Sequence, residues 1–478
     1  MTMRHTRFPA LAVGALLAAL AWAAPTACAA DPAPPVQPAA GDTAQQALAD
    51  WLEAFNSADA TRLEAFRDRW QPDMDVARML EFHAETGGFR LVRHEPGEPG
   101  TARALLQERE SDTVARLQFV LRPGEPAQFS LEAIEAPDDL RVQRMDADGA
   151  IASLVARADE LAARDAFSGV MLVADGDQVL LHRAWNRAGD AEAPVRLDSR
   201  FRIGSMNKMF TAVATLQLVQ AGRLSLDGTV GQYLPGYEDP GVAAVTIRQL
   251  LTHAGGTGDF FGPEFDANRL TLRTHDDYVR LFQKRPPDHV PGAEHRYSNY
   301  GFLLLGAIIE RASGQSYYDY VDEHVFAPAG MTRTGSLPED VPVDGRLTAY
   351  TRRDGAWHDA AETLPWRGTA AGGGYSTAGD LLRFARAMLD GRLLGPEMLA
   401  EATRNQSPWY GYGFMVREQD GARMFGHGGG APGMNGDLRI YPDQGIVVAG
   451  LSNLDPPAVS RLIDHYLLRM PLEADVGR

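Results

Sequence analysis

The chain has 478 residues, 45% of them hydrophobic and 8% aromatic, which is typical of a globular protein with two folded units. Its formal net charge of −17 argues against binding to nucleic acid or to an anionic membrane surface. The twelve histidines form no His-x-His or His-Glu-x-x-His pattern. The sequence therefore predicts no metal, no cofactor and a small-molecule partner.

Residues 1–30 have the pattern of a secretory signal peptide. Arg4 and Arg7 give a positive start, Leu11–Ala24 is a short apolar run, and small residues follow up to Ala30. The run is short for a membrane-spanning helix. The pattern predicts a periplasmic or secreted protein without a stable membrane anchor.

Cys28 is the only cysteine of the chain, and it lies inside this leader. Cleavage after Cys28 would leave a mature protein without disulfides, a cysteine nucleophile or a cysteine-ligated metal. The alternative is a lipoprotein anchored through Cys28. It is disfavoured because residues 25–27, Pro-Thr-Ala, lack the usual aliphatic residue.

A Pro/Ala-rich linker at 31–41 leads to a small α+β domain predicted at 42–140. Two helices, the second reaching Trp70, precede strands at Phe89–Val92, Arg103–Glu108, Val114–Leu121 and Gln128–Ile134. The element order and the Gly-Gly-Phe…Leu-Val-Arg stretch at 87–93 resemble the nuclear-transport-factor-like cone fold. No converging acid–base set occurs here, which favours an interaction module over a second catalytic domain.

The polar stretch Ala136–Gly149 predicts the boundary to a larger domain at 148–470. This domain begins with an amphipathic helix at Ile151–Ala163 and ends with a helix at Ala458–Met470. Strands are expected at Gly169–Ala174, Gln178–Ala184, Tyr412–Val416, Met424–His427, Asp437–Tyr441 and Ile446–Leu451. We expect an antiparallel sheet flanked by the terminal helices, with a helical part between them.

Within this domain, Phe201–Gln220 reads as a turn followed by a helix, with Ser205 and Lys208 at its start. Side chains three residues apart share a helix face, so the hydroxyl and the amine can meet. Serine needs a base to become a nucleophile, and lysine is a base only when its pKa falls from about 10.4. The chain has only two lysines, Lys208 and Lys284, among 46 basic residues, which favours a special role for Lys208.

Two further stretches complete the candidate site. Tyr297 and Asn299 precede a strong helix, where Ser298 or Asn299 could also simply cap it. The glycine-rich stretch Gly426–Gly433 follows a predicted strand and lets the backbone approach a ligand, or merely forms a bulge. Residues 374–378, Gly-Tyr-Ser-Thr-Ala, miss the final glycine of a nucleophile elbow and are interpreted as a decoy.

Ser205-x-x-Lys208, Tyr297-x-Asn299 and His427-Gly-Gly-Gly430 occur in the order typical of the β-lactamase and penicillin-binding-protein hydrolases. Together with Leu-Leu-Thr-His-Ala-Gly-Gly at 250–256, they resemble the class C branch, with its carboxylesterases and D-amino-acid peptidases. The resemblance covers about residues 148–470 and implies a β-lactamase/transpeptidase-like fold.

The resemblance also implies roles for these residues. Ser205 would attack a carbonyl and become acylated, while Lys208 and Tyr297 would carry the protons. Asn299 would hold the substrate and Lys208, His427 and Gly429 would contact the substrate, and the N–H groups of Ser205 and Gly430 would form the oxyanion hole.

His427 departs from the family pattern, in which lysine followed by Thr or Ser usually stands at this position. Histidine, with an ordinary pKa of about 6.5, is mostly uncharged near neutral pH and is expected to gain charge below about pH 6. A secreted serine hydrolase for esters or small amides is therefore favoured. The alternatives are a D-alanyl-D-alanine peptidase, a class C-like β-lactamase, or a non-catalytic binding protein of the same fold.

Overall fold

The structure is a computed structural model that describes residues 43–122, 125–187, 189, 194–353 and 355–472. The predicted signal peptide, Cys28 and the linker lie outside the described residues. The chain divides into two compact units between Met145 and Asp146, inside the boundary stretch expected from the sequence, and Asp464–Arg469 are grouped with the first unit. Within the described ranges, no helix is long and apolar enough to cross a bilayer.

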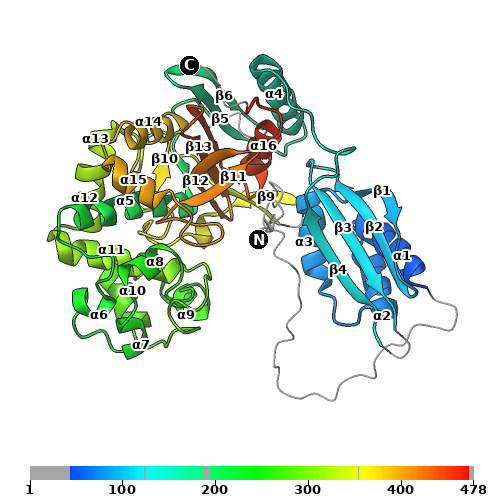
Figure 1. Cartoon of the computed structure of the whole chain (residues 1–478), viewed down its shortest axis with the longest axis horizontal. Coiled ribbons are helices and arrows are strands. Elements are labelled where there is room, and N and C mark those ends of the chain that lie inside the picture. The colour runs from blue at the N-terminus through cyan, green and yellow to red at the C-terminus, as the bar shows by residue number, and fades with distance from the viewer. Residues whose placement is uncertain (1–42, 123–124, 188, 190–193, 354, 473–478) are drawn as a thin grey trace, which may run out of the picture. The chain divides into compact units, whose positions relative to one another are not determined.

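The first unit has three helices followed by a four-stranded antiparallel meander in the order β1-β2-β3-β4 (Figure 1). The elements are α1 (Ala44–Ser57), α2 (Ala60–Trp70), α3 (Val76–Thr86), β1 (Phe89–Glu95), β2 (Thr101–Glu108), β3 (Val114–Val120) and β4 (Gln128–Ile134). The predicted order of helices before strands is confirmed. Helix α3 was not expected from the sequence; its start depends on a cap by Asp75, which accepts from the Arg78 N–H.

The core of the first unit forms because α1 places its aromatic residues against the sheet. Trp51 and Phe55 are fully buried and stack with ring centroids 4.8 Å apart. Helix α1 contacts β2 and β3, and Phe89 of β1 joins the same cluster. This packing gives the first unit a hydrophobic core of its own.

The second unit is built on a six-stranded antiparallel sheet in the order β11-β12-β13-β14-β5-β6. The strands are β5 (Gly169–Asp175), β6 (Gln178–Trp185), β11 (Met415–Gln419), β12 (Ala422–Ala431), β13 (Met434–Tyr441) and β14 (Ile446–Ser452). The first strand of the unit, β5, thus pairs with the last, β14, and the sheet is built from both ends of the unit, as expected from the sequence. β11 begins three residues later than expected, and β12 continues through the glycine run without the bulge that was one of its two interpretations.

Helices cover both faces of this sheet, which explains why every residue of β13 is buried. Helix α4 (Ala147–Ala163) contacts β6, and α16 (Ala458–Leu467) buries Val459 and Ile463 beside Gly450 of β14. Helices α14 (Ala378–Leu389) and α5 (Asn207–Gln220) contact β14 and β12, respectively. The sheet is therefore the middle layer of the second unit.

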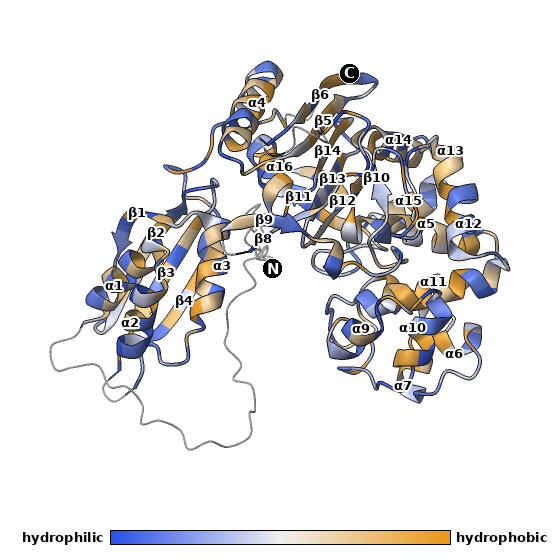
Figure 2. Cartoon of the chain, turned by 180° about the vertical axis from the view of Figure 1, so that it is seen from behind, coloured by the Kyte–Doolittle hydropathy of each residue, from blue (hydrophilic) through white to orange (hydrophobic). Residues whose placement is uncertain are grey.

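A helical part lies between β6 and α14 in the chain. Its helices are α6 (Val230–Tyr233), α7 (Pro240–Ala243), α8 (Ile247–Leu251), α9 (Pro263–Asn268), α10 (His275–Phe282), α11 (Asn299–Ser313), α12 (Tyr317–Val321), the π-helix η3 (Asp322–Phe326) and α13 (Ala327–Ala329). Helix α11 is its centre and contacts α5, α8, α10 and α12. Figure 2 shows α11 as strongly hydrophobic, consistent with its buried run from Tyr300 to Ile309.

Short elements complete the second unit. They are β7 (Phe201–Arg202), the 3-10 helices η2 (Gly204–Met206) and η4 (Ala361–Thr363), β8 (Tyr350–Arg353), β9 (Ala356–Asp359), β10 (Tyr375–Ser376) and α15 (Pro396–Ala402). β10 pairs with β7, which holds the segment before α14 beside the turn that carries Ser205.

Candidate active site

Ser205 lies in the 3-10 turn η2, directly before α5, and Lys208 lies in the first turn of α5. Gly204 has a φ of +53°, a conformation that glycine adopts readily, and this allows the sharp entry from β7. Helix α5 is buried on nearly all sides, so the first turn brings Lys208 into the interior while Ser205 stays partly exposed. The expected placement of this pair at a helix start is confirmed.

The Lys208 amine is fully buried, and three oxygen atoms surround it. It lies 3.2 Å from Ser205 Oγ, 2.7 Å from Asn299 Oδ1 and 2.5 Å from the carbonyl oxygen of Ala371. Burial lowers the pKa of Lys208 to about 7, although the nearby Asp259 carboxylate acts in the opposite direction. Lys208 can therefore be neutral at a mildly alkaline pH and can accept the proton of Ser205.

Tyr297 and Asn299 approach the same amine from the start of α11. The Tyr297 ring centroid lies 4.8 Å from Lys208 Nζ. Burial raises the pKa of Tyr297, while a hydrogen bond with Ser205 lowers it and Asp259 raises it further. Tyr297 is therefore a phenol near neutral pH and has a proton to donate.

Ser298, between these two residues, caps α11, because its Oγ accepts the Gly301 N–H at 2.9 Å. The turn can therefore cap the helix and also present Tyr297 and Asn299 to the site. The cap fixes the start of the helix, and the residues on either side of Ser298 face Lys208.

The glycine run of β12 packs directly on the Ser205 turn. A Cβ atom on Gly429 would lie 1.9 Å from the Ile203 carbonyl oxygen and 3.0 Å from the Ser205 nitrogen. A Cβ atom on Gly204 would lie 3.1 Å from the Gly430 nitrogen. Only glycine allows the two backbone segments to approach this closely. The approach brings the N–H groups of Ser205 and Gly430 close to each other.

His427 is buried, and other groups already occupy its ring nitrogens. Its Nδ1 lies 2.5 Å from the Gly428 carbonyl oxygen, so Nδ1 carries the proton, and Nε2 accepts from the Tyr410 hydroxyl at 2.8 Å. Burial, with the charges of Lys208 and Arg439 adding to it, lowers the pKa of His427 to about 3. The expectation that His427 gains charge below about pH 6 is therefore wrong, because the solvated reference value does not apply to a buried ring.

Three residues that were not expected from the sequence also line this site. His253, in the Leu250–Gly256 stretch, is buried with its ring 4.3 Å from that of Tyr297 and 4.5 Å from that of Tyr410. Its Nδ1 accepts the Ser298 N–H at 3.1 Å. Asp259 accepts from Asn299 Nδ2 at 2.8 Å. The Leu250–Gly256 motif, which contains His253, is visible in the sequence. Nothing in the sequence around Asp259 or Tyr410 indicates that these residues reach the site.

The interpretation of residues 374–378 as a decoy agrees with the geometry. Ser376 is fully buried, and its hydroxyl pairs with that of Thr334 at 2.8 Å. Its site therefore offers no access to a substrate. Among the described residues, no group of three or more His, Cys, Asp or Glu side chains is arranged to hold a metal ion.

The second unit is similar to known proteins. The family profile described as Beta-lactamase matches residues 150–470. The chain belongs to the beta-lactamase family. It is 33% identical to penicillin-binding protein 4 of Amycolatopsis lactamdurans, over 54% of this chain and 73% of that protein.

It is 32% identical to esterase EstB of Burkholderia gladioli, over 55% of this chain and 80% of that protein. A solved D-stereospecific amidohydrolase from Streptomyces sp. superposes with a TM-score of 0.56 at 31% identity, covering 66% of this chain and 97% of that one. The expected β-lactamase/transpeptidase-like fold and family are confirmed, and the family includes esterases, amidases and peptidases.

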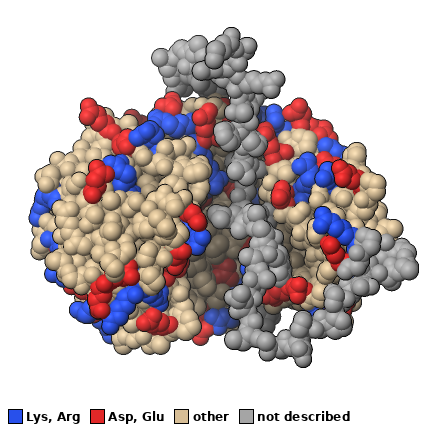
Figure 3. Space-filling view, turned by 60° about the horizontal axis from the view of Figure 1, so that its bottom comes forward, with Lys and Arg blue, Asp and Glu red and all other residues tan. Residues whose placement is uncertain are grey.

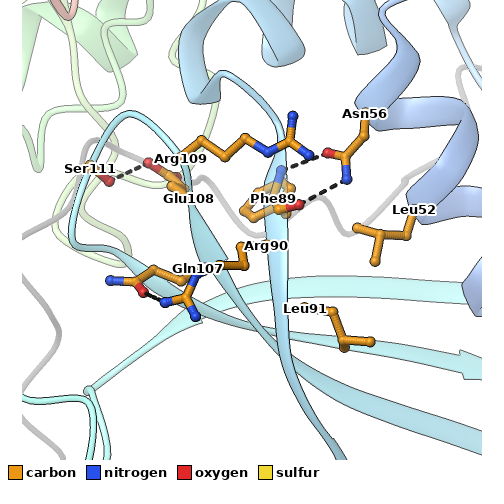
Figure 4. A pocket seen from close by; sticks show the side chains of 9 residues that line it. All are labelled: Leu52, Asn56, Phe89, Arg90, Leu91, Gln107, Glu108, Arg109 and Ser111. Carbon is orange, nitrogen blue, oxygen red and sulfur yellow. Dashed lines mark hydrogen bonds between the residues drawn. The ribbon is translucent and has the colours of Figure 1, made fainter.

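The first unit lies outside the residues matched to the beta-lactamase family and contains a separate hollow of about 640 Å³ (Figure 4). Figure 4 shows that its polar side chains mostly bond to neighbours: Glu108 with Ser111, Arg90 with Gln107, and Asn56 with the Phe89 backbone. None of the nine lining residues is a lysine or a histidine. The hollow therefore offers no nucleophile–base pair of the kind found around Ser205.

Proposed function

We propose that this protein is a secreted serine hydrolase that cleaves neutral esters or small amides through an acyl-enzyme on Ser205. The observation that carries the proposal is the buried Lys208 amine, which lies 3.2 Å from Ser205 Oγ and has its pKa lowered to about 7. An amine of this kind is a general base suited to activate a serine hydroxyl.

In the proposed reaction, Ser205 Oγ attacks the substrate carbonyl carbon while its proton passes to Lys208 Nζ. The carbonyl oxygen takes up negative charge and accepts hydrogen bonds from the N–H groups of Ser205 and Gly430. Tyr297 then gives its proton to the leaving oxygen or nitrogen and regains one from Lys208. Water releases the acyl group by the same steps in reverse, and Ser205 recovers its proton.

The preference for uncharged substrates is supported by His427. A neutral, buried imidazole bonded to Tyr410 and Gly428 gives no cation to a substrate carboxylate. A carboxylate-bearing penicillin or peptide would lose a charge-assisted hydrogen bond worth about 1.5–3 kcal/mol, which corresponds to about a ten- to hundred-fold weaker interaction. Because burial lowers the pKa of His427 to about 3, the charge of His427 adds no change to this preference between pH 5 and 8.

A fluorophosphonate probe tests the nucleophile. The wild-type protein should be labelled, and Ser205→Ala should lose both labelling and turnover while keeping its far-UV circular dichroism. An acyl adduct on the Ser205→Ala protein, detected by intact mass, would show that another residue is acylated.

The likeness to penicillin-binding protein 4 favours a β-lactamase or D-alanyl-D-alanine peptidase as the second candidate. The value of kcat/KM for p-nitrophenyl acetate and for nitrocefin separates the two. We expect ester hydrolysis to dominate. Efficient nitrocefin hydrolysis with negligible ester turnover would establish the second candidate instead.

A further inference from the structure

One buried side chain beside Tyr297 takes no part in the proposed reaction. His253, which follows α8, is only 1% exposed, and its ring centroid lies 4.3 Å from that of Tyr297. The rings of Phe302, Tyr410 and Trp409 also surround it, at 5.2, 4.5 and 6.1 Å. Burying the two ring nitrogens carries a desolvation cost that a phenyl ring would not have. Apolar packing alone therefore does not explain a histidine at this position.

Two hydrogen bonds to His253 hold the chain on either side of Tyr297. The main-chain carbonyl oxygen of His253 accepts the Arg296 N–H at 2.9 Å, and its ring Nδ1 accepts the Ser298 N–H at 3.1 Å. These two donors are the residues directly before and after Tyr297. One residue therefore fixes the backbone around Tyr297 and also packs against its ring.

The bond to Ser298 explains why this residue is a histidine. Because Nδ1 accepts a hydrogen bond, the ring proton is on Nε2. Burial, with the charge of Lys208 adding to it, lowers the pKa of His253 well below its usual value, so the ring stays neutral. Phenylalanine would keep a ring here but would offer no acceptor to the Ser298 N–H. Asparagine would offer one, since its Oδ1 is bonded to Cγ, as Nδ1 is in histidine.

Two features of His253 are unfavourable for stability. Its φ is +58°, a left-handed conformation that is uncommon for residues other than glycine. Its Nε2–H is buried, and it has no hydrogen-bond partner among the described residues. Strained backbone and unpaired polar groups are concentrated at functional sites, where the surrounding structure maintains them. Their presence at the residue that holds Tyr297 favours a functional reason for this arrangement.

Tyr297 is a group whose position matters for the proposed reaction. Its phenol gives a proton to the leaving group, and a proton donor must lie within hydrogen-bond reach of the atom that it protonates. Its ring packs 4.8 Å from Lys208 Nζ, and its hydroxyl bonds with Ser205. A tyrosine that is free to shift would lose the alignment with the leaving atom, so neighbours that lock it contribute to the rate.

We propose that His253 is a positioning residue that holds Tyr297 in line to protonate the leaving group. The proposal rests on the proposed function and goes beyond it, because it gives a role to a residue that acts only through Tyr297. It leads to a specific expectation. Loss of the His253 ring acceptor should slow the reaction of substrates whose leaving group needs a proton much more than that of substrates whose leaving group does not.

Two esters with the same acyl group separate this role from a general loss of structure. Ethyl acetate releases a strongly basic alkoxide that must be protonated, whereas p-nitrophenyl acetate releases a stable anion that leaves without a proton. The value of kcat/KM is measured for both, because it covers the steps up to release of the leaving group. In His253→Phe, kcat/KM for ethyl acetate should fall about 10²-fold, within the range of general-acid catalysis. The loss on p-nitrophenyl acetate should be at least about ten-fold smaller.

His253→Asn tests whether the ring acceptor carries the effect. Asparagine keeps an acceptor for the Ser298 N–H and tolerates a positive φ, so it should recover at least about ten-fold of the loss on ethyl acetate. His253→Gly suits the positive φ and removes the acceptor, and it takes the place of His253→Phe if circular dichroism shows that His253→Phe is unfolded. The control is His182→Phe in β6, which removes another histidine with a buried Nε2 and should leave the ratio of the two kcat/KM values unchanged.

A double variant decides whether His253 acts through Tyr297. Tyr297→Phe alone should show the same selective loss on ethyl acetate. Adding His253→Phe should lower kcat/KM less than about three-fold further, because the group that His253 positions is already gone. A folded His253→Phe or His253→Gly protein with the wild-type ratio overturns the proposal. So does a His253→Asn protein that recovers nothing, or a double variant in which the two losses multiply.

The same measurements separate this proposal from the proposed function. If Tyr297→Phe shows the selective loss and the His253 variants do not, the proposed reaction stands and the positioning role is refuted. If the wild-type protein hydrolyses neither ester and takes no fluorophosphonate label, the proposed function fails, and the positioning role fails with it.

Discussion

At the scale of single residues, the proposed activity depends on the burial of the Lys208 amine. Lysine loses rotamer freedom and hydration when it is buried, and chains rarely bury it without a partner. Here Lys208 has three oxygen neighbours and only one carboxylate, Asp259, acting from a distance. The arrangement favours the neutral amine, which is the form needed to activate Ser205.

The activity should therefore rise with pH through a pKa of about 7. Below this pH, Lys208 is protonated and cannot accept the Ser205 proton, so kcat/KM for p-nitrophenyl acetate falls tenfold per pH unit. His253 and His427 do not account for this step, because burial lowers the pKa of both below this range.

Lys208→Arg should reduce kcat by about 10²–10⁴-fold at every pH, since a guanidinium stays charged. The measurement is a pH–rate profile of the wild-type and variant proteins from pH 5 to 9. A variant that retains near-normal rates, or a wild-type profile without a step near pH 7, would contradict the role of Lys208.

A second residue-scale prediction concerns the pair formed by Tyr410 and His427. Tyr410→Phe removes the hydroxyl that donates to His427 Nε2, the one donor to this nitrogen among the described residues, and leaves a buried acceptor unpaired. We expect a loss of about 1–3 kcal/mol in the free energy of unfolding, measured by urea denaturation. The control is Tyr233→Phe, which removes a hydroxyl whose partner, the N–H of Ser225, is exposed to solvent. Equal losses in both variants would show that the buried Tyr410–His427 bond contributes no more to the free energy of unfolding than an exposed bond does.

At the scale of secondary-structure elements, strand β12 determines the geometry around Ser205. Its glycines let the strand lie on the Ser205 turn, and neighbouring positions differ sharply in the space they leave. A Cβ atom on Gly429 would overlap the Ile203 carbonyl, whereas a Cβ atom on Gly428 would meet its nearest atom at an ordinary 3.7 Å. Neither glycine has a positive φ that would strain an alanine.

Gly429→Ala should therefore displace β12 from Ser205 and disrupt the proposed oxyanion hole. We expect a loss of about 10²–10³-fold in kcat on p-nitrophenyl acetate, the effect of removing one oxyanion donor. Gly428→Ala, one residue away, should keep kcat within about three-fold. Thermal unfolding of both variants shows whether the fold persists. If the two alanines have the same effect on kcat, the close approach of Gly429 has no bearing on catalysis.

At the scale of the whole molecule, the net charge of −17 acts on charged substrates over a Debye length of about 8–10 Å. Figure 3 shows Lys and Arg side chains interspersed with Asp and Glu over the face in view. The long-range field therefore attracts cations only weakly at physiological salt.

The division into two units predicts that the second unit alone carries the activity, since all residues around Ser205 lie between Ile203 and Gly430. A fragment starting at Gln143 should keep kcat/KM on p-nitrophenyl acetate within about three-fold. It must include Asp146, which caps α4 by accepting the Gly149 N–H at 2.7 Å. A start at Asp148, suggested by the sequence, lacks this cap and should cost about 1 kcal/mol of stability. A well-folded fragment with a large loss of activity would contradict the prediction.

The sequence by itself determined the family, the order of elements and the pairing of Ser205 with Lys208, because these depend on local spacing and periodicity. Most strands of both units were located within a few residues, since alternation and turn residues are local signals. The tertiary structure decided the protonation of the site. Burial, which lowers the pKa of Lys208 and of His427, comes from residues distant in the chain.

The position of Asp259 beside Asn299 likewise depends on a loop 40 residues away in sequence. The contact of Gly429 with Ile203 likewise brings β12 onto the segment after β7, more than 200 residues earlier in the chain. Desolvation and close backbone contacts are properties of packing, and a reference pKa or a motif cannot report them. For this reason the sequence predicted the pairing of Ser205 with Lys208, while the lowered pKa of Lys208 emerged only from the fold.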